Sequence, residues 1–493
     1  MLNHINKFGN IYGHSRYNYP NNSGTKINYD GDFLWSGPWT SEENAIDIHE
    51  IKQIPNGNYM AFVPDYRPGP IPEGEWTSFF QQLGYAADGV TNEYPWEGMR
   101  LVEWDENANE VWSWDPYVHF TMDDYDAYGG TWLYSFNFNI FYDWMHSNAF
   151  HFDLEESVIY VSHRHLSRIS KIAYPSGEVI WNIGMPAEYN TGSNNICTDL
   201  GFSFQHNIQL LDDGSLLFFD NGNLSVMLMG DQNPTSRVRR IRVIDDTFCQ
   251  TIWEYELPEN LFGSGMGSVQ LLDNSNYLIY TYGNGLSQTD PTILEVTEDG
   301  EVVWSYVSPV YNTAWYRAYK IPSIHPNAFS VIAENYTINN NIHLDNNNLN
   351  FKIFNKSGYS QPYKYILSNM SSIDNQMFID VEGEVTIGPY MDADLFFEIN
   401  NQNILTSNIS LAIWPIHHKY SIKELNFEVI HDIVLMGDIN GDSIVNILDV
   451  VSIVGFVIGT IEFDDIQINL ADYNEDGSVD VLDIVSIVSF ILE

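Results

Sequence analysis

The sequence predicts a mainly β protein in three parts. These are a six-bladed β-propeller over residues 1–338, a small immunoglobulin-like β-sandwich over 339–434 and a small α-helical module over 435–493. Three observations carry this prediction. A pattern of strands and tryptophans recurs through residues 25–325, an Asn-rich stretch follows it, and one acidic loop pattern occurs twice in the last 56 residues. A chain of 493 residues is long enough for two or three domains.

Each repeat in the first part begins with a short apolar strand that ends in a polar turn, as at 51–58, 208–215 and 269–276. A second strand follows, and the repeat closes with a strand pair that carries a tryptophan. These tryptophans are Trp35, Trp112, Trp181, Trp253 and Trp304. Four strands joined by hairpin turns, with one packing tryptophan, are typical of a propeller blade. A β-sandwich is the alternative, which the regular placement of the tryptophans disfavours.

The number of blades follows from the spacing of the repeats. Where no insertion intervenes, the period is about 50–61 residues, which predicts five to six blades and favours six. Residues 64–100 and 115–142 are expected to form loops that extend one blade. The tryptophan strand at 25–35 comes before any first-strand pattern, so we expect it to complete a blade begun near 316–336. Such closure would remove the open edge of the ring.

The second part begins with an Asn-rich stretch at 339–350, which predicts a linker. Short alternating strands follow, as at 376–381 and 394–399. About 85 residues of this kind suit a small β-sandwich that ends near Val434. The segment carries no group of residues that suggests chemistry, so a spacer role is expected.

The third part carries two acidic loops that lie 34 residues apart. Oxygen-bearing side chains occupy positions 1, 3, 5, 9 and 12 of each loop, and an apolar helix pattern follows each one. This spacing lets one short turn collect six or seven oxygens around a hard cation. The residues are Asp438, Asn440, Asp442, Asn446 and Asp449 in the first loop, and Asp472, Asn474, Asp476, Asp480 and Asp483 in the second. Two calcium ions are predicted; a solvated acidic tail is the alternative.

The duplicated loops resemble a type I dockerin over residues 435–493. The resemblance implies a calcium-folded module that attaches secreted proteins to a cohesin-bearing scaffold or a cell surface. Ser443 stands where a loop glycine is usual, whereas Gly477 is present, so the first loop should bind calcium more weakly. The positions that partners read are apolar here: Ile447, Leu448, Val481 and Leu482. Packing of the two helices on each other or on the neighbouring domain is therefore an alternative to a cohesin partner.

Composition limits the compartment and the partners. The chain has 66 acidic residues against 20 Lys and Arg, a net charge of −46, which argues against nucleic acid and anionic membrane surfaces. No run of 18 apolar residues suggests a membrane span, and the first residues have no apolar leader core. Because a dockerin implies export, we expect a secreted protein whose leader is not in this chain. Cys197 and Cys249 either form one bridge or remain two free thiols.

The candidate functional residues lie just before the first strand of the repeats. His49, His146, His206 and Arg317 share nearly one phase, which in a propeller would place them around the mouth of the central channel. Arg164 and Arg237 follow two of these histidines, and a local excess of arginine can bind an anion. For Arg239, Arg240 and Arg242, a solvated strand face is the expected role of at least two.

Residues 25–336 resemble the bacterial arylsulfate sulfotransferases. The resemblance rests on segments 143–148, 162–164, 205–206, 219–223, 236–238 and 302–304. It implies a six-bladed propeller that moves a sulfuryl group between phenols through a transiently sulfated histidine. His146, His206 and Arg237 match the catalytic, sulfate-binding set, and His49, Arg164 and Arg317 are added as substrate-binding candidates.

The chain departs from that family at one place. The nucleophilic histidine of the family lies downstream of the Ser-Arg motif, but this chain has no histidine from Asn207 to Ile324. Without it the covalent step loses its acceptor. His325 follows in a turn, and His49, His163 and His165 are further substitutes if they line the channel.

Two functions follow from these observations. The first is a secreted protein that binds a small aromatic sulfate or another anionic ligand in its channel and transfers sulfuryl groups between phenolic compounds. The second is a catalytically inactive propeller that binds such a ligand or a sulfated glycan while the dockerin tethers it. A glycoside hydrolase is disfavoured, because no pair of carboxylates stands at equivalent positions of the repeats.

Overall fold

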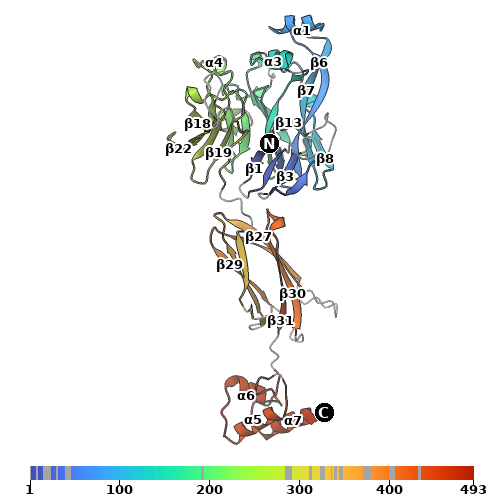
Figure 1. The fold of residues 1–493 in the computed structure, drawn as a ribbon, viewed down its shortest axis with the longest axis vertical. Coiled ribbons are helices and arrows are strands. Elements are labelled where there is room, and N and C mark those ends of the chain that lie inside the picture. The colour runs from blue at the N-terminus through green and yellow to red at the C-terminus, as the bar shows by residue number, and fades with distance from the viewer. Residues whose placement is uncertain are drawn as a thin grey trace. The chain divides into compact units, whose positions relative to one another are not determined.

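The computed structural model describes residues 2–6, 9–14, 24–28, 31–38, 46–138, 140–189, 194–283, 291–309, 314–321, 328–334, 336–337, 341–343, 348–369, 380–398, 406–430, 435–442 and 444–492. The chain is mainly β, as predicted, and divides into two compact units, residues 1–324 and 325–493 (Figure 1). No helix among these residues is long and apolar enough to cross a membrane.

The first unit contains five sheets whose main strands follow chain order, as expected for hairpin-connected repeats. The strands of the first two sheets are β1 (Leu2–Ile5), β2 (Ile11–His14), β3 (Gly24–Ile27) and β4 (Phe33–Ser36), then β5 (Ile51–Gln53), β6 (Tyr59–Pro70), β7 (Asn92–Trp104) and β8 (Glu110–Trp114), with β9 (Tyr142–Asp143) beside β7.

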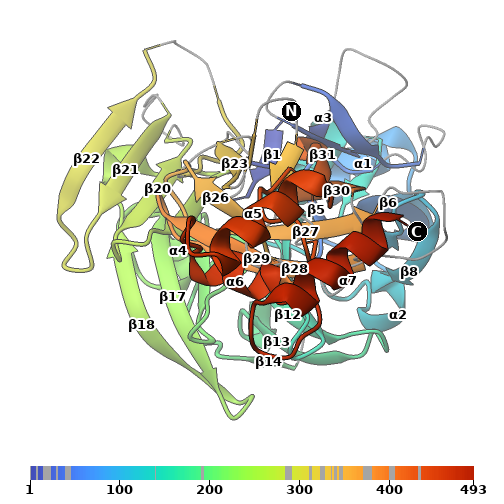
Figure 2. The same cartoon turned by 90° about the horizontal axis from the view of Figure 1, so that it is seen from below.

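The other three sheets repeat the arrangement (Figure 2). Their strands are β10 (Ser147–Asp153), β11 (Val158–His163), β12 (Arg168–Ala173), β13 (Val179–Gly184) and β14 (Asn195–Ile196); β15 (His206–Leu210), β16 (Leu216–Asp220), β17 (Arg237–Ile244) and β18 (Phe248–Glu256); and β19 (Ser268–Leu271), β20 (Tyr277–Thr281), β21 (Thr292–Val296) and β22 (Val302–Val307).

The five repeat tryptophans all lie on the fourth strand of their sheets, namely β4, β8, β13, β18 and β22. Four of them reach the following sheet. Trp35 stacks on Tyr59 at 3.9 Å and Trp253 on Tyr277 at 3.8 Å, between ring centroids. The indole nitrogens of Trp112 and Trp181 donate to the Pro175 carbonyl and the Asp246 carboxylate. Each of these tryptophans therefore fastens one sheet to the next.

Hydrogen bonds also connect the first strand of each sheet to the next sheet. Lys52 on β5 donates to the Phe150 carbonyl (2.7 Å), Asn148 on β10 to the Gln205 carbonyl (2.8 Å), and Gln209 on β15 to the Val269 carbonyl (2.6 Å). The sheets thus follow one another around a common centre, from β6–β8 through β12–β14 and β17–β18 to β20–β22 (Figure 2).

The predicted closure of the ring is wrong. β4 does not complete a blade begun near 316–336; it pairs with β3 of its own sheet. Residues 314–321 instead lie between the last and first sheets without forming a strand. The Ala318 amide donates to Ser268 on β19 (3.1 Å), and the Tyr319 hydroxyl donates to the Asn3 carbonyl on β1 (3.4 Å). Within the described residues there are five such sheets, so six blades are not confirmed.

The two stretches predicted as loops contain regular structure. β6 and β7 pair from Tyr59–Trp104 to Pro70–Asn92, so much of 64–100 is a long hairpin. Its tip carries α1 (Thr77–Leu83), while residues 115–142 contain α2 (Pro116–His119) and α3 (Thr131–Phe138). A largely aromatic core holds them, with Trp96, Trp132 and Tyr142 fully buried. The sequence obscured these elements because prolines and glycines interrupt the strand pattern.

One disulfide links the third and fourth sheets. Cys197, next to β14, is bonded to Cys249 on β18, which settles the two alternatives left by the sequence. The fourth sheet is followed by a 3₁₀ turn at Glu259–Leu261, and α4 (Ser225–Leu228) lies between β16 and β17.

The second unit begins with a sandwich of two sheets (Figure 1). One has the order β23-β26-β29 and the other β24-β25-β31-β30-β27-β28. Their inward side chains share one core that includes Phe351, Ile353, Leu411 and Val429. The strands are β23 (Phe329–Ala333), β24 (Tyr336–Thr337), β25 (Asn341–His343), β26 (Asn348–Asn355), β27 (Gln361–Asn369), β28 (Asp380–Ile387), β29 (Asp392–Glu398), β30 (Thr406–Pro415) and β31 (Lys423–Ile430). β23 pairs with β26, so the sandwich includes residues that precede the predicted start at 339.

Three helices form the rest of the second unit: α5 (Ile447–Val457), α6 (Asp465–Ala471) and α7 (Val481–Leu492). α5 and α7 contain the two predicted apolar helices. Ile453 and Ile487 are fully buried in their shared core, which explains the apolar pattern behind each acidic loop.

Candidate functional site

A cavity of about 500 Å³ lies in the first unit, where the loops before several inner strands meet. Four histidines, one arginine and three aromatic rings contribute to its wall: His49, His146, His165, His206, Arg164, Tyr134, Phe204 and Tyr316. They come from segments more than 250 residues apart in the chain, and the order of the sheets brings them together. Among the predicted site residues, His49, His146, His206 and Arg164 line this cavity.

The backbone around the cavity departs from ordinary conformations. His146 (φ 46°), Phe204 (φ 59°) and Met266 (φ 54°) are non-glycine residues with positive φ, and all three line the cavity. Each such residue costs about 1–3 kcal/mol and persists only where the surrounding fold imposes it. The fold therefore holds the His146 side chain in its position at a cost in conformational energy.

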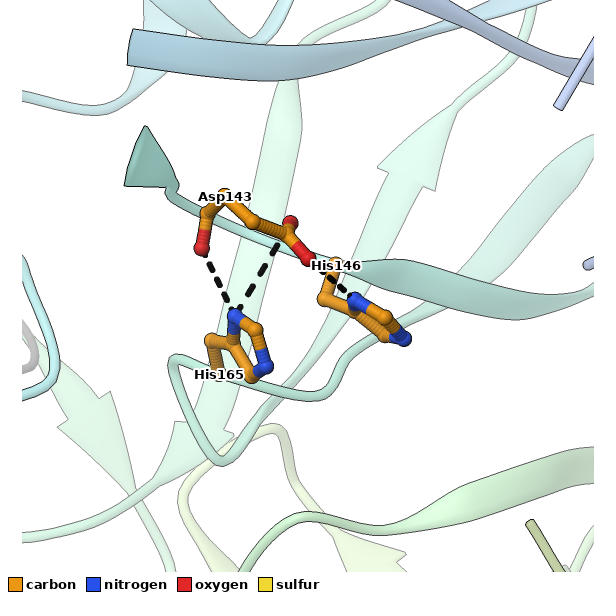
Figure 3. Close-up of side chains that lie close together, drawn as sticks. All are labelled: Asp143, His146 and His165. Atoms are coloured by element: carbon orange, nitrogen blue, oxygen red, sulfur yellow. Dashed lines mark hydrogen bonds and ion pairs between the residues drawn. The ribbon is translucent and has the colours of Figure 1, made fainter. Parts of the chain in front are cut away.

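Asp143 organises two of the histidines (Figure 3). His146 lies in the turn between β9 and β10, and its Nδ1 is 2.5 Å from the Asp143 carboxylate. The Nδ1 of His165, in the turn between β11 and β12, lies 2.7 Å from the Asp143 main-chain carbonyl. A carbonyl only accepts, so His165 must donate through Nδ1, which leaves the lone pair of its neutral ring on Nε2.

His49 forms a second carboxylate–histidine pair beside the first. Its Nδ1 is 2.5 Å from Asp47, whose same oxygen also accepts the His49 main-chain N–H at 2.9 Å. The rings of His49 and His146 are 4.4 Å apart between centroids. Two imidazoles, each fixed by a carboxylate on Nδ1, thus meet at one wall of the cavity.

His206 is fixed by amide groups. Its Nδ1 lies 2.6 Å from Asn221 Oδ1 and 3.1 Å from the Phe204 carbonyl. The orientation of the Asn221 amide is set, because its Nδ2 donates to the carbonyls of Gly263 and Met266. His206 therefore also donates through Nδ1, and Nε2 carries its lone pair.

Arg164 supplies the fixed positive charge of the cavity. Its Nη2 donates to the Ser264 carbonyl at 2.9 Å, and its guanidinium stacks over Phe204 at 4.7 Å from the ring centre. Burial lowers the Arg164 pKa to about 10, so the side chain remains a cation at neutral pH. These contacts leave guanidinium donors available for an anion in the cavity.

The two neighbouring carboxylate–histidine pairs differ in protonation. Burial lowers the pKa of His49, but the carboxylates of Asp47 and Asp143 outweigh it, so that the net pKa is raised. Burial, followed by the charges of His49 and Arg164, lowers the pKa of His146 well below its usual value. Burial is also the main cause that lowers the pKa of His165, to about 3, and of His206. One histidine therefore favours the charged form, and three favour the neutral form.

The other predicted arginines do not line the cavity. Arg237 is buried, with Nη1 and Nη2 2.8 and 2.9 Å from Asp231 and Nη2 2.8 Å from Glu256. Arg317 is buried beside the cavity residue Tyr316, where its Nη1 is 2.7 Å from Glu50. Arg239 is buried on Asp220 and Glu254, while Arg240 and Arg242 pair with Asp213 at the surface. These arginines are held by acidic residues.

The four histidines that could replace the missing nucleophile differ in their position relative to the cavity. His49 and His165 line the cavity. His163 is fully buried, with its Nδ1 2.8 Å from the Ser147 hydroxyl, and is not part of the wall. His325 lies outside the described residues.

Asp143, His146 and His165 are also compact enough to suggest a metal ion. One ligand atom of each lies within 4.8 Å of the others, and no other such group occurs in the described parts of the chain. However, the hydrogen bonds of both Nδ1 atoms to Asp143 account for this grouping, and Arg164 adds a positive charge to the same wall. We assign no metal ion to it.

The two acidic loops are wound alike. Asn440 Oδ1 accepts the Asp442 amide and Asn474 Oδ1 the Asp476 amide, both at 2.9 Å. The carboxylates at position 12, Asp449 and Asp483, are fully buried and accept amides from the beginning and the middle of their own loops. Each loop thus already curves around its oxygen-bearing residues, as a calcium loop requires.

Residues 86–320 match the model of the arylsulfotransferase (ASST) family, and residues 436–492 match the type I dockerin domain. The chain combines an arylsulfotransferase-family region with a type I dockerin domain. Both resemblances seen in the sequence are confirmed. Type I dockerin domains bind calcium and cohesin partners and occur in extracellular proteins, and the two acidic loops lie within the matched residues.

Several solved structures resemble this dockerin-bearing chain at low sequence identity. An extracellular domain from B. thetaiotaomicron is 11% identical, with 87% of this chain and 56% of that chain covered and a TM-score of 0.29. The periplasmic gluconolactonase of Pseudomonas aeruginosa is 11% identical (60% and 66% covered, TM-score 0.31), and a protein from Lactobacillus plantarum 7% identical (85% and 95%, TM-score 0.32). The chain spans 56% and 66% of the length of the first two.

No curated protein matches the chain. Asp143 and Tyr316, which line the cavity, and Asp47, which is paired with His49, were not selected from the sequence. Asp143 and Asp47 precede His146 and His49 by three and two residues, so their proximity to a selected histidine was the available signal.

Proposed function

We propose that the cavity binds a small aromatic sulfate ester and transfers its sulfuryl group to a phenolic acceptor. The observation that carries this proposal is the convergence of His49, His146, His206 and Arg164 on one cavity. All four were singled out by their place in the repeats, and two of them by resemblance to the arylsulfate sulfotransferases.

The charges of the cavity support an anionic ligand. The Arg164 guanidinium and the His49 imidazolium place two cations in a region of a strongly acidic chain. Their donors can neutralise the charge on the oxygens of a sulfuryl group during transfer, as donors do in other loose group transfers. Two positive donors on opposite segments also hold the ester in a fixed orientation.

The apolar part of the wall supports an aromatic ligand. Phe204 and Tyr316 flank the histidines, and the Tyr316 ring lies 5.7 Å from His49 and 6.4 Å from His206, between centroids. Tyr134 on α3 also contributes to the wall and is 59% exposed. Aromatic rings pack edge to face or offset at such distances.

We infer for the fold that the first unit is a propeller with six positions. Five are filled by sheets, and residues 314–321 fill the sixth. The hydrogen bonds of this segment to Ser268 and Asn3 support the inference, because they connect the fifth sheet to the first. The residues predicted as blade ends would then surround one central channel.

For the dockerin domain we propose two calcium ions, one in each loop, and a cohesin-like or cell-surface partner. The similar winding of the two loops supports two ions. Partner binding would tether a secreted protein, while the sandwich serves as a spacer.

A second candidate function is binding without turnover, of the same ester or of a sulfated glycan. Two observations favour it. No histidine occurs from Asn207 to Ile324, where the family nucleophile is expected, and acidic residues bind Arg237 outside the cavity. Both candidates use the same cavity.

The test is an assay of the full chain with p-nitrophenyl sulfate and phenol, which follows p-nitrophenol by absorbance. Transfer predicts release that depends on phenol. Titration calorimetry with the same ester measures binding separately, and Arg164→Gln should weaken it about 10- to 100-fold, because a hydrogen bond to a charged group is worth about 1.5–3 kcal/mol.

Arg242→Gln is the matched control for this experiment. Arg242 is an arginine of the same region that pairs with Asp213 at the surface, so its loss should leave affinity unchanged. Binding without release would favour the second candidate. If the ester does not bind, or if both variants bind it as the wild type does, the cavity is not the site.

A further inference from the structure

We propose that His146 takes the place of the missing nucleophile and that His49 is the general acid that protonates the leaving phenol. This assignment rests on the proposed sulfuryl transfer. It gives different roles to two neighbouring histidines that share one wall of the cavity.

His146 is the cavity histidine that a bound ester can reach most easily. Of the four cavity histidines, His146 has the most exposed side chain, at 23%, against 14% for His49 and 9% for His165. His206 is only 2% exposed. A nucleophile must reach the sulfur of a bound ester, and His146 is the ring that the cavity leaves most open.

The second argument is the carboxylate on Nδ1. Asp143 lies 2.5 Å from His146 Nδ1, so the neutral ring directs its Nε2 lone pair away from Asp143. The same carboxylate would balance the positive charge that the ring gains when Nε2 bonds to sulfur. The oxygens nearest to Nδ1 of His165 and His206 are uncharged, and the Asp143 carboxylate lies 3.8 Å from His165 Nδ1, too far for a hydrogen bond. Neither ring therefore has a carboxylate hydrogen-bonded to Nδ1. A neighbouring carboxylate of this kind orients and stabilises a charged imidazole in other histidine sites.

The third argument is the position of His49. Its ring centroid is 4.4 Å from that of His146, so a group that reacts at one ring is within reach of the other. Asp47 lies 2.5 Å from its Nδ1, which favours the imidazolium and makes Nε2 the position of the transferable proton. A cation beside a neutral base is the arrangement that acid–base catalysis of a group transfer requires.

The reaction then balances without a further reagent. The Nε2 lone pair of His146 forms the N–S bond while the bond from sulfur to the aryl oxygen breaks. The aryl oxygen leaves with that electron pair and takes the proton from His49 Nε2. In the second half, the acceptor phenol attacks sulfur and gives its proton to His49, and the N–S electron pair returns to His146.

The strained backbone of His146 decides which variants are useful. At φ 46°, alanine would be strained, whereas glycine adopts this conformation freely and leaves space for a small molecule. His146→Gly is therefore the variant to test, with thermal unfolding to show that it is folded. His119→Gln, at an exposed histidine outside the cavity wall, is the control.

The experiment incubates each protein with p-nitrophenyl sulfate without acceptor and measures the initial burst, the intact mass and the modified peptide. The wild type and His119→Gln should show a stoichiometric burst and gain one SO₃ group on His146. His146→Gly should show neither, and added imidazole should restore p-nitrophenol release without labelling the protein.

His49→Gln tests the acid. It should keep the label on His146 but react about 10²–10⁴-fold more slowly with phenyl sulfate. The loss should be much smaller with p-nitrophenyl sulfate, because p-nitrophenolate leaves without a proton. An equal loss with both esters would overturn the role of His49.

Three results would overturn the role of His146: a label on another histidine, a burst in His146→Gly without imidazole, or a wild-type reaction that a chelator abolishes. In each case transfer itself still occurs, so the proposed function survives. If the wild type binds the ester but neither releases phenol nor gains mass, transfer fails, and this assignment fails with it.

Discussion

His49 and His146 are equivalent in chemistry and nearly in contact, yet their surroundings give them opposite preferences for the proton. His49 is faced by Asp47, Asp143, Arg164 and the His146 ring, and the two carboxylates prevail. For His146, burial and the charges of His49 and Arg164 prevail. Burial and the two neighbouring cations together therefore keep the His146 ring neutral, while two carboxylates favour the charged form of His49.

This difference predicts the pH dependence of the reaction. The neutral form of His146 is lost as pH falls through its lowered pKa, so the acid limb of kcat/KM should lie below about 6.5, the ordinary histidine value. The charged form of His49 is lost as pH rises through its raised pKa, so the alkaline limb should lie above that value. A pH series with phenyl sulfate measures both limbs.

The variants assign each limb. His49→Gln should abolish the alkaline limb and keep the acid one, because glutamine does not titrate. If the acid limb disappears instead, the two roles are exchanged. His119→Gln should leave both limbs in place.

At the scale of elements, a fully buried ion pair joins the segment 314–321 to Glu50, the residue directly before β5. Arg317 Nη1 lies 2.7 Å from Glu50, and Arg317 Nη2 donates to the Asn148 carbonyl on β10 at 2.9 Å. Lys52 lies 3.3 Å from the same glutamate. In the sequence, Glu50 directly follows His49 and Arg317 directly follows Tyr316. The cluster therefore supports two residues of the cavity wall.

Removing one partner of this pair should destabilise the first unit strongly. Glu50→Gln should lower the free energy of unfolding by about 3–5 kcal/mol, because the Arg317 charge is then buried without a carboxylate. Arg317→Met should cost somewhat less, because Lys52 still lies 3.3 Å from Glu50. The double variant should lose less than the sum. Denaturant unfolding of the full chain, followed by tryptophan fluorescence, measures these values.

Lys320→Met provides the comparison within the same segment. Lys320 pairs with Glu295 at 2.9 Å, but its side chain is 56% exposed, so its loss should cost less than about 1 kcal/mol. Equal losses for Lys320→Met and Arg317→Met would contradict the importance assigned to the buried pair.

At the same scale, the sequence revealed elements whose partners are close in the chain. The first and second strands of the repeats form local hairpins and occur as β5, β6, β15, β16, β19 and β20. The tryptophan strands likewise needed only a local hairpin. The pairing of β4 was not predicted, because residues 2–14 carry no tryptophan, although Asn6, Gly9 and Asn10 are turn residues. The chain was therefore assigned a distant partner, although the nearby β3 costs less loop-closure entropy.

The site divides in the same way. The meeting of His49, His146 and His206 could be predicted, since equal phase in a repeat places side chains at equal depth. Arg164 was selected only because it follows a histidine, and Arg317, which shares the phase, does not line the cavity. Asp47 and Asp143 could not be distinguished among 66 acidic residues. Arg237 matched a family motif, but it forms ion pairs with Asp231 and Glu256. No periodic pattern in the sequence predicts these two acidic partners.

For the whole molecule, calcium is expected to control one part and not the other. The acidic loops precede α5 and α7, and a bound cation would lower the free-energy cost of burying the side chains of Asp449 and Asp483. The first unit is stabilised by large cores and one disulfide. The two parts should therefore respond differently to a chelator.

We expect EDTA to unfold the dockerin domain and leave the first unit folded. Calorimetry of the full chain should show a transition that moves to higher temperature as calcium is added, because a ligand that binds only the folded state stabilises it by mass action. Replacing Asp483 by alanine should reduce this shift more than replacing Asp449, since the second loop is expected to bind more tightly. Ester binding should be unchanged by EDTA, and a loss of ester binding would contradict the independence of the two parts.

The segment that carries Tyr316 has a consequence for how this protein can be altered. The segment that connects the last sheet to the first by hydrogen bonds also contributes the Tyr316 ring to the cavity wall. A cut or insertion near residue 318 would thus change ligand binding and the contacts of both the first and the last sheet together. One short segment thus determines both the connection between the two sheets and the shape of the cavity, so neither can change in evolution without the other.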